Sequence, residues 1–491
     1  MKKNALLARL LCMLLALIML LGMAVSCTTE DDDSDPNATA STDSTEEEIP
    51  TEEEIDDGLD GLNFGESVRI VTSKDQSYQV YHEEETDNVI YNALYKRVMT
   101  VEERLGISIG WYPMDAGWNK QRDIFFQHIQ TTCETGPAYD ALCLYNLMPG
   151  ALAAKGLVEN LTDTNYINLE APWWPEDFVE QIVINDTLYS LVENSSYGTL
   201  RNIHGVFFNN KLLNDHDLRS PYDMVAANEW TFADMIALVK DRGADLNENG
   251  SEDKDDFFGV VTGTEAKIET WFYGMGYKYS NKNEAGELEF SMADTNYMIS
   301  WLDEFTEAVA SKDFWIWDKE GHTKSFFKEH AILYMTAIRM VEHGASAETK
   351  MDYGVVPVPK KDASQENYIT NVANSHDMWC IPININDMDI SSALVECMAV
   401  EAYKQVAPVY FDQCIKLRYA PDERLAAMYD LIRDSIVFDF CTIYSFALPS
   451  VPRSLLHSSA KNPQTDPWPS NWEKNGPPME SGFDAILELY R

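Results

Sequence analysis

Basic side chains are scarce in this sequence of 491 residues. Lys and Arg number 37 against 81 Asp and Glu, which gives a formal net charge of −44. A protein that binds nucleic acid needs clustered Lys and Arg to meet the phosphates, so a nucleic-acid partner is excluded. The same acidity favours calcium over strongly anionic ligands.

Cysteine is also sparse, and no two cysteines form a Cys-x-x-Cys pair. A zinc site is therefore not expected. The cysteines beyond residue 27 are too few to act as a disulfide framework in so large a chain. Burial in the reduced form is one expectation for them, and the sequence leaves their pairing open. These cysteines are Cys133, Cys143, Cys380, Cys397, Cys414 and Cys441.

Familiar catalytic motifs are absent as well. The sequence contains no G-x-S-x-G, no H-E-x-x-H and no P-loop, and His82-Glu83 lacks the second His of a zinc-protease motif. Paired acids for glycoside hydrolysis stay open, because their geometry is spatial and leaves no sequence spacing to find. We expect a protein that is not an enzyme.

The apolar run near the amino end, residues 10–21, is too short to span a membrane. Basic residues precede it and small residues follow, so residues 1–26 are predicted to be a secretory signal. The small residues before Cys27 resemble a bacterial lipobox, although Ala24 stands where that motif usually has Leu. We expect a lipidated Cys27 that anchors an exported protein to the outer face of the cell membrane; the alternative is an ordinary signal peptide.

An acidic segment follows the predicted signal. Residues 28–60 hold fifteen acids, no Lys or Arg, and almost no large apolar side chains. Such a segment cannot form a core, and its like charges extend it. Residues 27–61 are therefore predicted to be a disordered stalk.

Strands and helices alternate at the start of the remaining body. Strand patterns at 68–72, 107–112 and 141–145 alternate with helical patterns at 88–105 and 120–130. This alternation predicts an α/β fold with parallel strands, in which ligands bind beyond the carboxyl ends of the strands.

Later segments extend this pattern. Residues 187–192 and 206–209 are predicted strands, and 391–406 and 422–438 are predicted helices. The stretch 461–478 is rich in Pro, Asn and Gly and is predicted to be a surface loop.

Several segments together resemble one family. The stretches "YDALCLYNLMPGALAAKGLVENLTD", "FFNNKLL" and "EWTFADMIALVKD" are followed by "FFKEHAILYM", "DYGVVPVPK" and "MWCIPININ". In this order and spacing they resemble the family 1 extracellular solute-binding proteins of ABC transporters, and most closely their clostridial lipoprotein members. His330 departs from the pattern, since the family usually has Gly there.

The resemblance implies a two-lobed, periplasmic-binding-protein-like α/β fold of type II, with lobes joined by crossover strands. One lobe would comprise 62–203 plus 358–420, and the other 204–357 plus 421–491. It also implies a monomer that closes on a small-molecule ligand and passes it to ABC permease subunits. The membrane would be contacted through the lipid anchor only.

The family's contact loops imply the ligand-binding residues. Sugar sites combine aromatic faces with planar polar side chains, so these residue types in the loops after strands are the candidates. The candidates are Asp75, Tyr145, Asn146, Tyr197, Arg201, Glu265, Trp271, Arg339, Asn374, His376 and Tyr444.

An acidic loop in the second half of the body has calcium-like spacing. Oxygen-bearing side chains fall at positions 1, 3, 5, 9 and 12 of a twelve-residue loop, and Gly250 occupies position six. Position 12 is Asp rather than Glu, and position 8 is Glu252 rather than an apolar residue. A structural Ca²⁺ is predicted; the alternative is a solvated acidic turn. The metal-binding residues would be Asp245, Asn247, Asn249, Ser251, Asp253 and Asp256.

The sequence thus predicts a lipoprotein that captures a carbohydrate, an oligosaccharide by preference, for an ABC importer. A binding protein for another solute, such as a peptide, is the first alternative. An extracellular glycoside hydrolase is the second, and a surface adhesion lipoprotein without a soluble ligand is the third.

Overall fold

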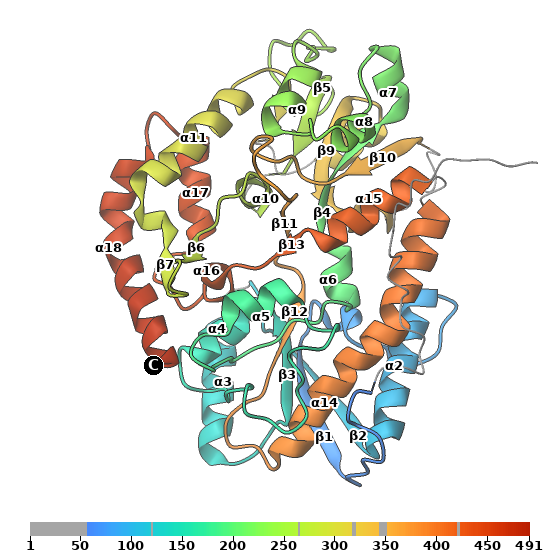
Figure 1. Ribbon diagram of the computed structural model, residues 1–491, viewed down its shortest axis with the longest axis vertical. Coiled ribbons are helices and arrows are strands. Elements are labelled where there is room, and N and C mark those ends of the chain that lie inside the picture. Colours follow the sequence, from blue (N-terminus) through green and yellow to red (C-terminus); the bar gives the residue numbers. More distant parts are fainter. Residues whose placement is uncertain (1–55, 119–120, 264–265, 317–320, 343–350, 420–422) are drawn as a thin grey trace, which may run out of the picture. The chain divides into compact units, whose positions relative to one another are not determined.

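The structure is a computed structural model (Figure 1), and it describes residues 56–118, 121–263, 266–316, 321–342, 351–419 and 423–491. The predicted signal, Cys27, most of the predicted stalk and Glu265 lie outside the described residues. Residues 56–491 form one compact unit. Leu59 is fully buried in it, and Asp57 forms ion pairs with Arg104 and Lys404. These two residues, which the sequence assigns to the stalk, are therefore part of the body.

The first sheet has four strands in the order β12-β3-β1-β2. β1 and β2 are parallel, as are β1 and β3, whereas β12 joins from far along the chain and runs antiparallel to β3. Three strands predicted from the sequence are thereby confirmed, with small shifts at their ends. The strands are β1 (Ser67–Ser73), β2 (Ser108–Met114), β3 (Ala141–Tyr145) and β12 (Asp377–Cys380).

Helices cover this sheet, and α2 shows why its sequence forms one. The Asn88 side chain accepts hydrogen bonds from two backbone N–H groups at its start, and Gly106 ends it with φ of 60°. Figure 1 shows α14 alongside α2, and the two helices pack together. The elements near this sheet are η1 (Ser77–Gln79), α2 (Val89–Leu105), α3 (Arg122–Thr135), α4 (Met148–Ala153), α5 (Glu176–Ile182), α6 (Tyr197–Arg201) and α14 (Met388–Glu401).

The second sheet has five strands in the order β10-β4-β9-β5-β8. β5 is parallel to β8 and β9, while β4 is antiparallel to both β9 and β10. All of these strands are strongly apolar, as expected for a sheet covered on both faces. They are β4 (His204–Asn209), β5 (Phe258–Thr262), β8 (Phe314–Trp315), β9 (Ala331–Ala337) and β10 (Tyr353–Val356).

Further helices and a small hairpin surround the second sheet. The Thr231 side chain caps α9 by accepting a hydrogen bond from the Asp234 N–H, as the sequence predicts. The elements are α7 (Asn210–Asp215), α8 (Pro221–Ala226), α9 (Phe232–Val239), α10 (Ala266–Gly274), β6 (Ser280–Lys282), β7 (Leu288–Phe290), η2 (Ser291–Ala293), α11 (Thr295–Val309), α12 (His322–Phe327) and η3 (Ile338–Glu342).

Short crossover strands connect the two sheets. β11 (Thr370–Asn371) pairs in parallel with β13 (Ile436–Val437), and Ile203 forms a bridge with Val372 beside them. Figure 1 shows β11 and β13 between the two sheets. The chain reaches β13 through η4 (Ala402–Val406), η5 (Pro408–Tyr419) and α15 (Glu423–Asp434).

Two sequence predictions about local structure are wrong. The predicted strand at 187–192 makes only isolated bridges, because it lies at the border of the first sheet rather than in it. The predicted surface loop at 461–478 contains the first half of α18 (Trp468–Leu487), although Pro477 and Pro478 lie inside that helix. Burial of apolar side chains against α11 and α17 (Pro452–Lys461) outweighs the low helix propensity of these residues. The last elements are α16 (Phe440–Ile443) and η6 (Glu488–Tyr490).

Candidate functional site

The first sheet presents its ligand-facing edge at the carboxyl ends of its parallel strands. Tyr78 follows β1, Trp118 follows β2, and Tyr145 ends β3. Because β12 is antiparallel, its amino end lies at the same edge, with Asp377 opposite Tyr145. Asn374, just before β12, therefore lies among the same loops. Tyr78 and Trp118 are 37% and 48% exposed, which leaves both rings available to a ligand.

Tyr145 is the most enclosed of these aromatics. It is buried, its N–H donates to the Ser73 hydroxyl at 2.8 Å, and its side chain interacts with Arg453 and Asn374. Burial raises the pKa of its hydroxyl to about 12, so the group is a neutral donor at any physiological pH. The buried Oδ1 of Asn374 has no hydrogen-bond partner in the described structure and is free to accept one.

The second sheet brings three basic side chains to its facing edge. Arg201 ends α6 just before β4, and Arg339 follows β9. His204 of β4 pairs with Ala337 of β9, so the two arginines come to the same end of the antiparallel pair. β5 is parallel to β9, which brings Lys267, at the start of α10, to that end as well.

Contacts between loops of the two edges define one candidate site. The Arg201 Nη1 donates to the Tyr78 hydroxyl at 2.8 Å, and its guanidinium lies 5.5 Å from the centre of that ring. The guanidinium of Arg453, in α17, lies 4.9 Å from the centre of the Trp118 ring. Trp118 also contacts Phe446, with ring centroids 5.3 Å apart. Aromatic faces and fixed polar groups are thus combined, as in a site for a polar organic ligand.

The Glu342 side chain is fixed beside this site by several hydrogen bonds. Its carboxylate accepts hydrogen bonds from Arg201, from the Tyr197 hydroxyl at 3.3 Å and from the Tyr410 hydroxyl at 2.7 Å. The Arg201 guanidinium also lies 5.0 Å from the centre of the Tyr197 ring. These contacts fix both Arg201 and Tyr197 at the junction of the two sheets. Tyr197 is itself buried, so Arg201 is the more accessible of the two.

Not every predicted ligand residue lies with this group. Asp75 is exposed and lies close to Tyr78 in the sequence. Asn146 and His376 are buried, and a backbone hydrogen bond of 3.1 Å joins them. Trp271 is fully buried against Phe232 and does not lie with this group. Tyr444 is buried too, hydrogen-bonded to Tyr490, and is likewise a core residue.

Sequence reasoning missed five residues of this group: Trp118, Lys267, Glu342, Phe446 and Arg453. Trp118 carries a usable signal, because it lies in the loop after β2, at the carboxyl edge that the fold class singles out. Arg453 and Phe446 come from the last sixty residues, whose packing against the first sheet's loops no local pattern predicts.

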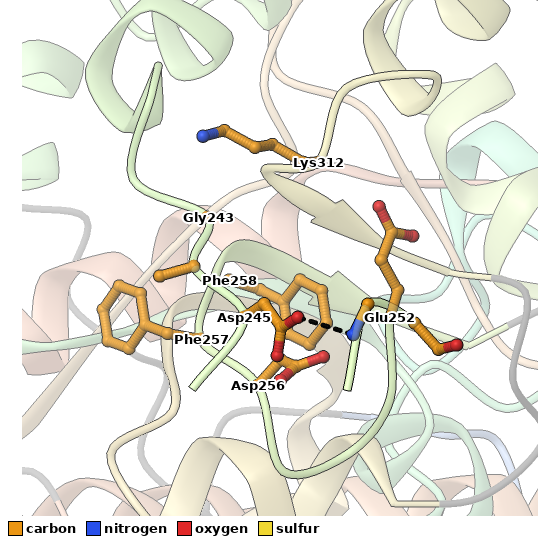
Figure 2. A pocket seen from close by; sticks show the side chains of 10 residues that line it. Gly243, Asp245, Glu252, Asp256, Phe257, Phe258 and Lys312 are labelled. Atoms are coloured by element: carbon orange, nitrogen blue, oxygen red, sulfur yellow. Dashed lines mark hydrogen bonds between the residues drawn. The ribbon is translucent and has the colours of Figure 1, made fainter. Parts of the chain in front are cut away.

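The acidic loop at 245–256 is closed by its own hydrogen bonds. Figure 2 shows Asp245 accepting a hydrogen bond from the Gly250 N–H, at 2.8 Å, while the Glu252 side chain points away from it. Both oxygens of the buried Asp256 accept backbone N–H groups, from Leu246 and Asp253. Within the described part of the chain, no group of three or more His, Cys, Asp or Glu side chains is arranged to hold a metal ion. The oxygen-bearing side chains of the loop are of the kind that calcium prefers, and the metal stays a prediction.

Two general expectations can be compared with the described residues. The cysteines at 133, 143, 380, 397 and 441 are free thiols, and all five are buried. In the ranges that the structure covers, no helix is long and apolar enough to cross a membrane.

Comparison with known proteins identifies the fold. No known family matches the chain by sequence, and neither does any curated protein. Solved structures do match, and they are two-lobed sugar-binding proteins. The chain therefore has the two-lobed α/β fold of periplasmic solute-binding proteins, with β11 and β13 among the strands that cross between the lobes.

Two of these structures illustrate the likeness. One is a cyclo/maltodextrin-binding protein in complex with maltotetraose, with a TM-score of 0.53 and 12% identity, over 86% of this chain and 96% of that one. The other is the GacH receptor of Streptomyces glaucescens, described unliganded and with acarbose, with a TM-score of 0.52 and 12% identity, over 87% and 99%. At this identity the likeness concerns the fold.

Proposed function

We propose that the protein is a solute-binding lipoprotein that captures an oligosaccharide and delivers it to an ABC importer. The observation that carries the proposal is the meeting of exposed aromatic and fixed polar side chains from both sheets, around Trp118, Tyr78, Arg201 and Arg453. Apolar faces of sugar rings stack on aromatics, and planar polar groups take the hydroxyls. The neighbours in fold, crystallised with maltotetraose and acarbose, support a sugar ligand.

Binding without catalysis accounts for this arrangement. A solute-binding protein needs two faces and a hinge, and its ligand favours the closed state through differential affinity. Short crossover strands such as β11 and β13 are suitable hinges, because few residues connect the lobes there. A glycoside hydrolase would need a pair of acids flanking one bond, whereas Glu342 and Glu269 are each committed to an arginine.

A thermal-shift screen of residues 56–491 tests the proposal. The panel contains mono- and oligosaccharides, neutral and acidic, together with a set of short peptides. A ligand that binds only the folded state raises the melting temperature by mass action, so a rise with one sugar class supports the proposal. A rise with peptides alone would replace the sugar by the peptide alternative, and hydrolysis of a chromogenic sugar would identify an enzyme instead.

The membrane anchor is a separate part of the proposal. Lipidation of Cys27 would hold the protein at the outer face of the cell membrane, beside its importer. Mass spectrometry of the mature amino terminus tests this directly, and Cys27→Ala should release the protein into the medium. Retention of this variant in the membrane fraction would contradict the anchor.

A further inference from the structure

The basic side chains at the edge of the second sheet exceed the acids available to them. Arg201, Lys267 and Arg339 come from three separate segments and influence one another electrostatically. Glu342 is a carboxylate that acts on Arg339. Among the described residues, neither Arg339 nor Lys267 forms an ion pair with an acid.

Glu342 cannot serve the second arginine. Its two oxygens already accept from Arg201, Tyr197 and Tyr410, which together occupy the carboxylate on both sides. Arg339 forms no hydrogen bond or ion pair with any described residue. Burial, together with the neighbouring Arg201, lowers its pKa, as expected for a guanidinium without a counter-charge.

Lys267 is in a similar position. Its Nζ donates to the Nε2 of His204 at 2.6 Å, while the other ring nitrogen, Nδ1, donates to the Asn371 carbonyl at 3.2 Å. That tautomer makes His204 a neutral acceptor, so it gives Lys267 a hydrogen bond but no negative charge. Burial and the nearby Arg339 lower the pKa of Lys267. Partial burial of two cations without an acidic partner among the described residues costs free energy, and a ligand with a negative charge would offset that cost.

Both side chains stay within reach of a ligand. Arg339 and Lys267 are partly exposed, and the exposed Tyr78 lies beside them through Arg201. The rest of the molecule is strongly acidic, which led us to expect discrimination against anionic ligands. At physiological ionic strength distant charges are screened beyond about 8 Å, so the local cations decide the preference at the site.

We propose that the ligand is an acidic oligosaccharide, whose carboxylate or sulfate group is bound by Arg339 and Lys267 while its rings lie against Tyr78 and Trp118. The inference rests on the proposed function, because it names the class of sugar that the same site takes. A planar carboxylate matches the fork of a guanidinium, and Lys267 adds a single charge at its side.

Isothermal titration with three oligosaccharides of equal length tests the inference. The probes are a neutral oligosaccharide, a uronate-containing one and a sulfated one. Tighter binding of either acidic probe, by tenfold or more, supports the inference and shows which anion is preferred. Tighter or equal binding of the neutral probe overturns it and leaves the proposed function intact. Failure of all three to bind contradicts the inference and the proposed function together.

Substitutions of the two cations test whether they cause the preference for an acidic sugar. Arg339→Gln and Lys267→Met should each weaken the acidic probe at least tenfold and weaken the neutral probe by a clearly smaller factor. Arg219→Gln is the matched control, because it removes an equal charge from an exposed position paired with Glu229. Lys267 is the more enclosed of the two, so Arg339→Gln keeps the test valid if the lysine variant does not fold. Equal losses for acidic and neutral probes would overturn the assignment.

Discussion

Trp118 exposes a large aromatic ring at the candidate site. Its ring is 48% exposed, although Phe446 and Arg453 contact it. We predict that Trp118→Ala weakens oligosaccharide binding by about tenfold, or about 1.4 kcal/mol, because a stacking surface for a sugar ring is lost. Isothermal titration measures the loss, and the melting temperature should change little.

Tyr112→Ala is the control for this substitution. Tyr112 is 42% exposed, but it packs edge-on against Tyr139, at the amino end of β3, away from the candidate site. Its removal should leave affinity unchanged. If both variants bind as tightly as the wild type, Trp118 has no part in ligand binding.

Glu396 should make stability depend on pH. It is fully buried in α14, where its oxygens accept from the indole N–H groups of Trp173 at 2.7 Å and Trp174 at 3.1 Å. Burial raises its pKa from 4.5 to about 7. The folded carboxyl therefore keeps its proton to higher pH than the unfolded one, so the free energy of unfolding falls as pH rises from about 4.5 to about 7, by on the order of 3 kcal/mol.

Glu396→Gln removes this titration while keeping the size of the side chain. The variant should be less stable than wild type at pH 5, since one indole loses its acceptor, and should gain on it steadily up to pH 8. Denaturant unfolding at several pH values measures the difference, with Glu473→Gln as an exposed control. A constant difference across this range would show that Glu396 does not change protonation on folding.

Single residues of the site were only partly predictable. Tyr145, Arg201, Arg339 and Asn374 lie at strand ends, where the fold class puts ligand contacts. The structure brings Tyr145 close to Asn374, and Arg201 close to Arg339. Trp271 lies apart from them, because sequence position does not give the direction of a helical side chain, and the Trp271 side chain in α10 is buried.

At the level of elements, α4 and α16 pack with almost no space between them. A Cβ on Gly150, in α4, would lie 2.5 Å from the carbonyl oxygen of Ile443. Because that neighbour is backbone, it cannot move aside as a side chain would. Gly150→Ala should therefore lower stability by about 1–3 kcal/mol, measured by denaturant unfolding.

Gly117→Ala provides the comparison, since a Cβ there meets no atom within 4 Å. Its stability should stay within about 0.5 kcal/mol of the wild type. Equal effects of the two substitutions would mean that the contact between α4 and α16 is looser than described.

The acidic loop between α9 and β5 gives a prediction about metal. Calcium should raise the melting temperature of the wild type and a chelator should lower it, because a metal that binds only the folded loop stabilises it. Asp245→Ala and Asp253→Ala should abolish this response. Glu252→Ala, which removes the same charge from a side chain that points away (Figure 2), should keep it. No difference between calcium and chelator would remove the metal site.

Helices and strands with one apolar face were easier to predict than the individual residues of the site. α2, β1 and β3 follow their periodic patterns closely, with caps at Asn88 and Gly106. α18 was missed because its two prolines and polar residues read as a loop, while its burial against α11 and α17 depends on chain segments far away in sequence.

For the whole molecule, the order of motifs along the chain predicts the architecture. The shared order of weak motifs led to a two-lobed fold, which the solved structures bear out. Net charge does not decide the ligand, because −44 is a sum over the whole chain, whereas the charge at the facing edge depends on which few side chains the fold gathers.

The central claim is that loops of both sheets bind one ligand together. Hydrogen exchange of residues 56–491, with and without the oligosaccharide that binds most tightly, tests it most directly. The account predicts slower exchange in the Tyr78 and Trp118 loops of the first sheet and, at the same ligand concentration, around Arg201 and Arg339 of the second. Slower exchange on one sheet alone, or elsewhere in the molecule, would contradict it.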